Sequence, residues 1–148
     1  MKDKNHVLVL FIITKLELGG AQKVCLSLFK GLRKYGVKTA LISGTEGVLV
    51  ESIKHFDSVY LQQTLKREVG ARLIFKEIFS FWEMWKTIRK LKKQYVKIIV
   101  HTHSTKAGLM GRWAAFFAGV TYIIHTVHGF GFNDFQKWYI WWPIYFWN

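Results

Sequence analysis

A continuous apolar run near the start of the chain constrains the fold more than any other feature. Residues 7–13, VLVLFII, carry no polar side chain. Such a run is typical of a parallel strand that is covered on both faces. The glycine pair Gly19 and Gly20 follows, and apolar residues then recur at helical intervals over residues 21–35. This order predicts a buried strand, a turn and a helix in succession.

The same alternation continues along the chain. Further strands are expected at residues 37–43, 58–61, 97–102 and 121–127, and further helices at residues 49–55, 72–94 and about 104–118. Alternating strands and helices predict an α/β fold with a parallel sheet and helices on both faces. Because ligands in such sheets bind at the carboxyl ends of the strands, the glycine pair, residues 101–104 and residues 128–131 should gather in space.

The composition limits the partners of this chain. With 148 residues, 51% of them hydrophobic, it can form one domain with a core. The single cysteine, Cys25, cannot form an internal disulfide, and its place inside the first helix predicts a buried, unreactive thiol. The net charge of +13 favours polyanionic partners such as nucleic acid, anionic lipid or phosphorylated substrates. No apolar stretch approaches the roughly 18 residues of a spanning helix, so none is expected.

Two interpretations are open for the segment GGAQ. A glycine turn at a helix N-terminus can bring a phosphate close to free backbone N–H groups and to the positive end of the helix dipole. An ordinary strand-to-helix turn uses the same residues. The third glycine of the dinucleotide fingerprint is missing, and no acidic residue ends the second strand, which argues against a nicotinamide or flavin enzyme. No cofactor is therefore expected.

The segment HTHSTKAGLMGR places polar residues at the end of the fourth strand. His101 and His103 should share one face of that strand. Ser104 or Thr105 can cap the following helix, and Lys106 adds a positive charge near its N-terminus. For any one of these residues, a binding role and plain packing with a cap are equally open.

The segment IIHTVHGFGF ends the fifth strand with a histidine. His128 lies where the strand gives way to a loop, and Gly129 frees the backbone beside it. A histidine there can act as a general acid or base, or donate a hydrogen bond to a sugar hydroxyl or a phosphate. His125 lies on the opposite strand face, where a core histidine bonded to a carbonyl is favoured. The histidines have no cysteine or carboxylate nearby and no tight ligand spacing, so no metal is expected.

A basic helix carries a separate signal. Residues 66–97 combine many lysines and arginines with two tryptophans, a pattern that can lie in the plane of an anionic membrane. The residues expected to face that membrane are Trp82, Trp85, Lys86, Lys90 and Lys93. The stripe expected to pack inward is Ile74, Ile78, Phe81, Trp85 and Ile88. The alternative is a core helix with a solvated basic side, and both descriptions can hold at once.

Together, the motifs LELGGAQKV, HTHSTKAGLMGRWAA and IIHTVHGFGF, in this order and spacing, resemble the N-terminal domain of the family 4 glycosyltransferases. The similarity is to the branch that builds bacterial capsular and lipopolysaccharide sugars, and it runs from residue 7 to about residue 132. It implies the GT-B fold, in which two Rossmann-like domains face each other across a cleft. It also implies transfer of a sugar from a nucleotide-sugar, with retention of configuration, to a saccharide on a polyprenyl-diphosphate lipid. The location implied is cytoplasmic, on the inner face of the cell membrane.

The resemblance also assigns roles to residues. Gly19 and Gly20 would lie by the donor diphosphate, His128 by the transferred sugar, and residues 103–106 on the acceptor side. The residues expected to bind substrate or phosphate are Gly19, Gly20, Arg67, His103, Ser104, Lys106 and Gly129. His128 is expected to be the catalytic residue, close to both the transferred sugar and the acceptor.

The domain expectation is that residues 1–132 form this acceptor-side domain. Residues 133–148 would be an aromatic helix or linker towards a donor-binding domain, which the 148 residues do not contain, so the chain alone is expected to be inactive. The alternative is a non-enzymatic basic module that binds a membrane or RNA on the same scaffold. Under the glycosyltransferase interpretation, no nucleic acid partner is expected.

Overall fold

The strands and helices follow one another as the hydrophobic pattern predicts. The computed structural model describes residues 3–65 and 74–128. The elements are β1 (Asp3–Ile12), α1 (Gly20–Lys34), β2 (Lys38–Gly44), the 3-10 helix η1 (Val48–Ser52), β3 (Val59–Gln62), α2 (Ile74–Gln94), β4 (Tyr95–His103), α3 (Thr105–Phe117) and β5 (Tyr122–Thr126). The short helix expected at residues 49–55 is therefore a 3-10 helix, and it begins one residue earlier than predicted.

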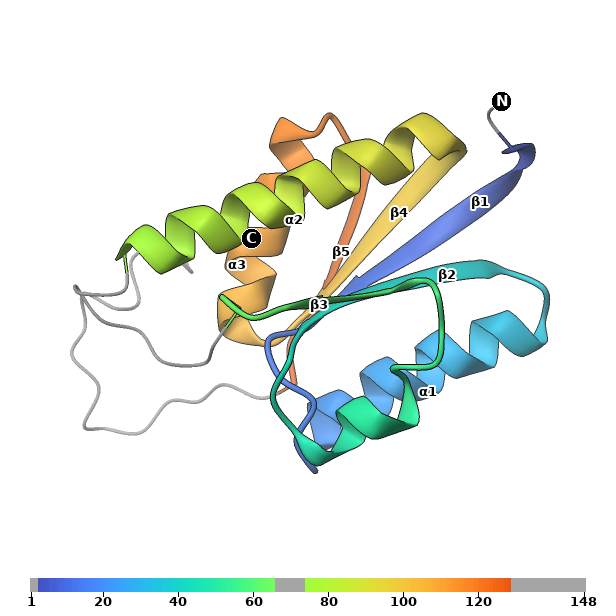
Figure 1. The fold of residues 1–148 in the computed structure, drawn as a ribbon. Helices are drawn as coiled ribbons and strands as arrows, with labels where there is room; N and C mark the ends of the chain where they lie inside the picture. Colours follow the sequence, from blue (N-terminus) through green and yellow to red (C-terminus); the bar gives the residue numbers. More distant parts are fainter. Residues whose placement is uncertain (1–2, 66–73, 129–148) are drawn as a thin grey trace.

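The five strands form one parallel sheet in the order β3-β2-β1-β4-β5 (Figure 1). The chain builds outwards from β1 to β3, then crosses to the other side of β1 and builds outwards again. The direction of building therefore reverses between β1 and β4, where Ile12 pairs with Thr102 at the carboxyl ends. Such a reversal opens a crevice between the loops that follow the two strands, and ligands of parallel sheets bind there.

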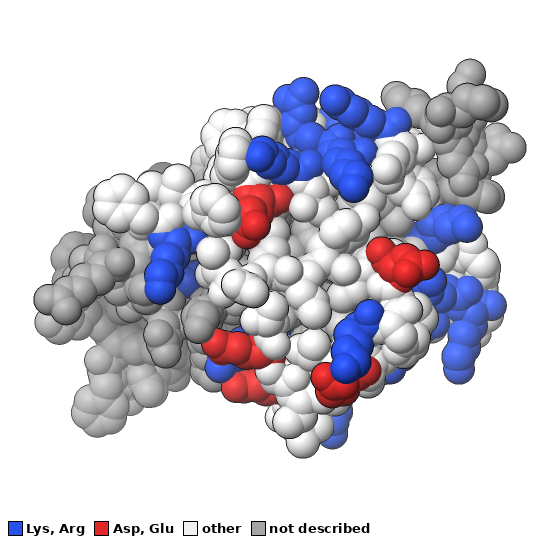
Figure 2. All heavy atoms as spheres, in the orientation of Figure 1, with Lys and Arg blue, Asp and Glu red and all other residues white. Residues whose placement is uncertain are grey.

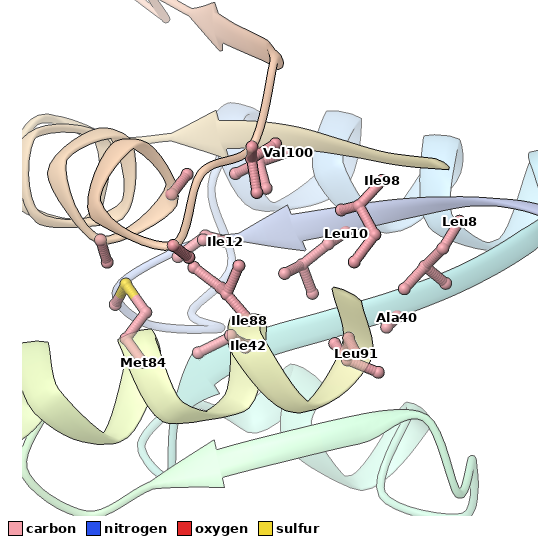
Figure 3. Packing of buried hydrophobic residues seen from close by; sticks show 14 of the residues in the cluster. Leu8, Leu10, Ile12, Ala40, Ile42, Met84, Ile88, Leu91, Ile98 and Val100 are labelled. Carbon is pink, nitrogen blue, oxygen red and sulfur yellow. The ribbon is translucent and has the colours of Figure 1, made fainter. Parts of the chain in front are cut away.

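Two cores cover the two faces of the sheet. Leu8, Leu10 and Ile12 point into the core under α2 and α3 (Figure 3). Phe11 and Ile13 point into the core under α1 and η1. Alternate residues of β1 thus feed opposite cores. This explains why the run has no polar side, and it confirms the predicted α/β fold with helices on both faces.

Helix α2 packs with part of the predicted stripe: Ile88 is buried and Phe81 and Trp85 are partly buried, as expected. Ile78, expected to face inward, is 60% exposed. The side chains buried against the sheet are Ser80, Met84, Ile88 and Leu91, with Phe81 and Trp85 partly buried beside them. The prediction was wrong for Ile78 because large apolar residues occur around most of this helix, so their spacing did not single out one face.

Helix α3 lies unusually close to the centre of the sheet. A Cβ atom added to Gly111 would come 2.9 Å from Cγ2 of Thr102 and 3.1 Å from Cδ1 of Ile12. Glycine at this position therefore lets α3 rest directly on β4 and β1. The helix ends before Gly119, whose φ of 72° is the left-handed conformation that glycine adopts most readily.

Candidate active site

Thr14, two residues beyond β1, ties the end of that strand to the start of α3. Its Oγ1 lies 2.8 Å from Oγ of Ser104 and accepts a hydrogen bond of 3.3 Å from the backbone N–H of Ala107. Its carbonyl oxygen accepts a further bond from the N–H of Gly44, at the end of β2. Ser104 is the N-cap residue of α3, but its own side chain makes no cap hydrogen bond. Thr14 therefore satisfies a helix N–H that a cap residue ordinarily satisfies.

Ser104 has a strained backbone. Its φ of 63° and ψ of 154° make it the one non-glycine residue with positive φ among those the structure describes. A residue in this region costs about 1–3 kcal/mol, persists only when its surroundings hold it, and is found most often at functional sites. The bond to Thr14 is such a restraint, so the turn into α3 is fixed at the crevice between β1 and β4.

Three histidines stand in a row beside this turn, on the face that carries α1. His103 ends β4, is fully buried, and has its Nδ1 2.8 Å from Nε2 of His128. His101 has its Nε2 2.7 Å from Oγ1 of Thr126. The ring centroids of His101 and His103 are 4.3 Å apart, those of His103 and His128 are 5.1 Å apart, and Phe11 packs against the first two rings. His101 and His103 share a strand face, as predicted.

The buried rings of this row are electrically neutral at ordinary pH. Burial lowers the pKa of His103 to about 3, and the neighbouring His101, His128 and His125 lower it further. Burial also lowers the pKa of His101, with a smaller contribution from His128. Both rings can therefore exchange hydrogen bonds at this site, but they do not carry a positive charge to a phosphate.

His125 lies on the other face of the sheet. Its Nδ1 is 2.9 Å from Oγ1 of Thr102. Its ring also fills the space beside Gly108, where a Cβ atom would come 2.5 Å from Cε1. Its contacts are those of packing. Across the described residues, no group of three or more histidine, cysteine, aspartate or glutamate side chains could hold a metal ion.

The glycine pair forms the N-terminus of α1, which begins at the same edge of the sheet as the histidine row (Figure 1). Gly19 is the N-cap residue, with no side-chain cap, and the first turn of the helix contains no acidic residue. A Cβ atom on Gly19 would come 2.5 Å from Oε1 of Gln22. Around the Cβ position of Gly20, no described atom other than those of its neighbours and its own helix backbone lies within 4 Å, so packing does not explain this glycine.

Of the remaining predicted site residues, one is held in an ion pair and two lie outside the described residues. Lys106 is in the first turn of α3, but its Nζ lies 3.1 Å from Oε1 of Glu77 on α2. Its charge is thus shared with a carboxylate. Arg67 and Gly129 lie outside the described residues.

A second surface is formed by α2 and α3, and we call it the α2–α3 surface. Lysine and arginine side chains gather over the second half of α2 (Figure 2), where Nζ of Lys86 lies 3.2 Å from the ring centroid of Trp82. Lys90 and Lys93 are exposed, whereas Trp85 is partly buried in the core. The exposed apolar side chains of the α2–α3 surface are Phe75, Ile78, Phe79, Trp82, Leu109, Trp113, Phe116 and Phe117. No helix in the described part of the chain is long and apolar enough to cross a membrane.

Sequence reasoning missed two parts of these sites. Thr14 was not singled out, although it is the polar residue that ends the apolar run of β1, and that position is a usable signal. The aromatic side of α3, with Trp113, Phe116 and Phe117, was also missed, because its residues read equally well as core. Trp113 and Phe117 in fact stack on each other with centroids 5.7 Å apart at the surface.

The sequence is similar to known glycosyltransferases. The profile of Glycosyltransferase Family 4 matches residues 18–147. Over 120 residues the chain is 34% identical to the Escherichia coli UDP-Gal:alpha-D-GlcNAc-diphosphoundecaprenol alpha-1,3-galactosyltransferase. The aligned part is 81% of this chain but 29% of that enzyme, so the chain spans less than a third of its relative.

Solved structures agree on the fold. MurG from Acinetobacter baumannii superposes with a TM-score of 0.58 at 18% identity, covering 84% of this chain and 37% of MurG. A glycosyltransferase from Rickettsia africae gives a TM-score of 0.62 at 19% identity, covering 93% of this chain and 34% of the other. The parallel sheet is thus the Rossmann-like half of a GT-B fold. With the profile matching most of its length, the chain belongs to glycosyltransferase family 4.

Proposed function

We propose that this chain is the acceptor-side domain of a retaining glycosyltransferase that moves a sugar from a nucleotide-sugar to a lipid-linked saccharide. The observation that carries the proposal is the constellation at the carboxyl edge of the sheet. There, the Thr14–Ser104 contact lies at the reversal point of the strand order, the His103–His128 pair lies at the ends of β4 and β5, and α1 begins at the same edge (Figure 1). The E. coli relative is named for galactosyl transfer to a diphosphoundecaprenol-linked GlcNAc, which supports this class of donor and acceptor.

The geometry suggests a role for each part of the edge. Gly19 and Gly20 would offer the N-terminal backbone N–H groups of α1, which have no partner within the helix, and Gly20 would leave open space for the donor diphosphate. His128, exposed at the end of β5, would contact the transferred sugar, and the strained turn at Ser104 would line the acceptor side. Residues 1–132 would form this domain, and residues 133–148 would lead to the donor-binding half.

The α2–α3 surface fits an acceptor that is held in a membrane. Exposed lysines beside exposed aromatic side chains are the combination that anchors a protein to an anionic lipid surface. We therefore place the enzyme in the cytoplasm, on the inner face of the cell membrane, with lipid rather than nucleic acid as the polyanion that its positive charge attracts.

A chimaeric enzyme tests the transfer function. The matched 120 residues of the E. coli relative are replaced by the corresponding residues of this chain, and galactosyl transfer to the lipid-linked GlcNAc is measured. We expect transfer, and we expect His128→Ala to reduce it strongly because the catalytic contact is lost. His55→Ala, at an exposed histidine in the connection between η1 and β3, is the control.

Two outcomes would count against the proposal. A folded chimaera that transfers no sugar would remove the support for the enzymatic role. Transfer that His128→Ala leaves at the control level would mean that the carboxyl edge is not the reaction site.

Vesicle binding tests the membrane surface. Replacing Lys86, Lys90 and Lys93 by Glu removes basic residues that each contribute about 1 kcal/mol at an anionic surface, so binding should weaken roughly 100-fold or more. The control variant makes the same charge change at Lys23, Lys34 and Lys38, which are exposed but lie outside α2.

The vesicle experiment also separates the alternatives. Equal loss in both variants would point to net charge alone and overturn the assignment of the surface. Salt-sensitive RNA binding in place of vesicle binding would favour the non-enzymatic basic module.

A further inference from the structure

His103 has one hydrogen-bond partner where its ring could have two. Its Nδ1 lies 2.8 Å from Nε2 of His128. Its Nε2 is buried and has no hydrogen-bond partner among the described residues. The ring is fully buried and lies against Phe11 and His101, so bulk solvent does not reach this nitrogen.

This unequal environment decides which nitrogen of His103 carries the proton. A neutral imidazole has one N–H donor and one bare acceptor nitrogen. If Nε2 of His103 carried the proton, a buried N–H would have no acceptor, and such orphaned donors are rare in folded proteins. If Nδ1 carries it, that N–H donates to His128, and the nitrogen left over is a bare acceptor. Burial keeps the His103 ring neutral, so the second arrangement holds a single proton on Nδ1.

We propose that His103 is a positioning residue whose Nδ1–H donates to Nε2 of His128 and thereby fixes neutral His128 with its proton on Nδ1. The assignment deepens the proposed function and rests on it for the meaning of His128. With Nε2 occupied by His103, the ring nitrogen that His128 has left for a ligand is Nδ1, as a donor. In the transfer reaction His128 would then donate a hydrogen bond to a sugar hydroxyl or a phosphate oxygen, and would not serve as a general base.

Ring nitrogen NMR tests the assignment without any sugar transfer. Long-range ¹H–¹⁵N correlation spectra of the ¹⁵N-labelled chain report which nitrogen of each neutral imidazole is protonated. The His128 signals are identified by their loss in His128→Gln. In the wild-type chain at neutral pH we expect a protonated Nδ1 and a bare Nε2 at His128, and the same tautomer at His103.

Three variants separate positioning from packing. His103→Phe keeps a planar ring but no donor, and should return His128 to a mixture in which the Nε2–H form appears. His103→Asn places an amide N–H near the former Nδ1 and should restore the Nδ1–H tautomer. His101→Gln is the matched control, because His101 lies on the same strand face, 4.3 Å from His103 between centroids, but bonds Thr126 instead. It should leave the His128 tautomer unchanged.

The wild-type spectrum alone can overturn the proposal. A proton on Nε2 of His128 would contradict it directly, even if His103→Phe failed to fold. An unchanged His128 tautomer in folded His103→Phe would show that His103 does not set it. Because none of these readouts requires catalysis, an inactive chimaera together with the expected tautomers would reject the proposed function and keep this inference.

Discussion

Lowering the pH from about 7.5 to about 5 should destabilise this domain through His103. The folded chain holds the ring neutral, with a pKa of about 3, because the ring is buried and lies near His101, His125 and His128. The unfolded chain exposes the ring, whose ordinary pKa is near 6.5. Between these values the unfolded state binds a proton that the folded state does not bind, so the free energy of unfolding falls as the pH falls.

The size of the effect follows from these two pKa values. The stabilisation is complete above about pH 6.5 and is lost progressively below it. At pH 5 nearly all unfolded chains carry the proton while the folded ring stays neutral, which lowers the free energy of unfolding by about 2 kcal/mol. His101 and His125, whose pKa values are also lowered chiefly by burial, add to the loss in the same direction. Carboxylates contribute little there, since their unfolded pKa values lie near 4.

Urea unfolding at the two pH values measures this loss. Wild type, His103→Asn and His55→Asn are compared, with His55 as an exposed histidine that controls for removing an imidazole. We expect His103→Asn to lose about 2 kcal/mol less than wild type on acidification, whatever its stability at pH 7.5. We expect the His55 variant to behave as wild type. An equal loss in wild type and His103→Asn would refute the reasoning.

Three further predictions concern the scaffold around the site. Thr14→Val keeps the shape of the side chain but removes the hydrogen-bond partner of the α3 N-terminus. It should lower the free energy of unfolding, measured in urea, by about 1–3 kcal/mol, which is more than the loss expected for Ser104→Ala. Gly111→Ala should cost about 1–3 kcal/mol because its methyl group would press on β1 and β4, whereas Gly31→Ala, in open space on α1, should be neutral or stabilise by up to about 1 kcal/mol. Cys25 is fully buried, and burial raises its pKa to about 12, so a thiol reagent should modify it only at the rate of unfolding.

The sequence predicted the scaffold well because both faces of a central parallel strand are buried. The run at residues 7–13 therefore has no polar face, and the same logic located β2 and β4. Glycines marked the ends of elements, as Gly119 does after α3, since its positive φ is difficult for other residues. Of the segments expected to gather at the carboxyl edge, the ends of β4 and β5 are in contact through His103 and His128, and β1 lies next to β4 in the sheet. Residues 129–131 lie outside the described residues.

What the sequence did not predict depends on contacts between distant segments. The bond between Thr14 and Ser104 joins residues 90 positions apart, and no local pattern specifies it. The pairing of His103 with His128 depends on the register of β4 against β5 in the same way. In α2, the burial of Ser80 and the exposure of Ile78 are set by which side of the helix meets the sheet and α3. Apolar spacing could not decide this on a helix with apolar residues on most sides.

An NMR titration of the chain with a short-chain prenyl-diphosphate-linked GlcNAc tests the central claim most directly. The claim is that the carboxyl edge of β1, β4 and β5 binds the diphosphate-linked sugar. We predict that the amide signals of His103, Ser104 and His128, on the acceptor side of that edge, shift in a saturable way, and that His128→Ala weakens the binding. Shifts confined to the α2–α3 surface, with the edge unchanged at saturation, would contradict the claim.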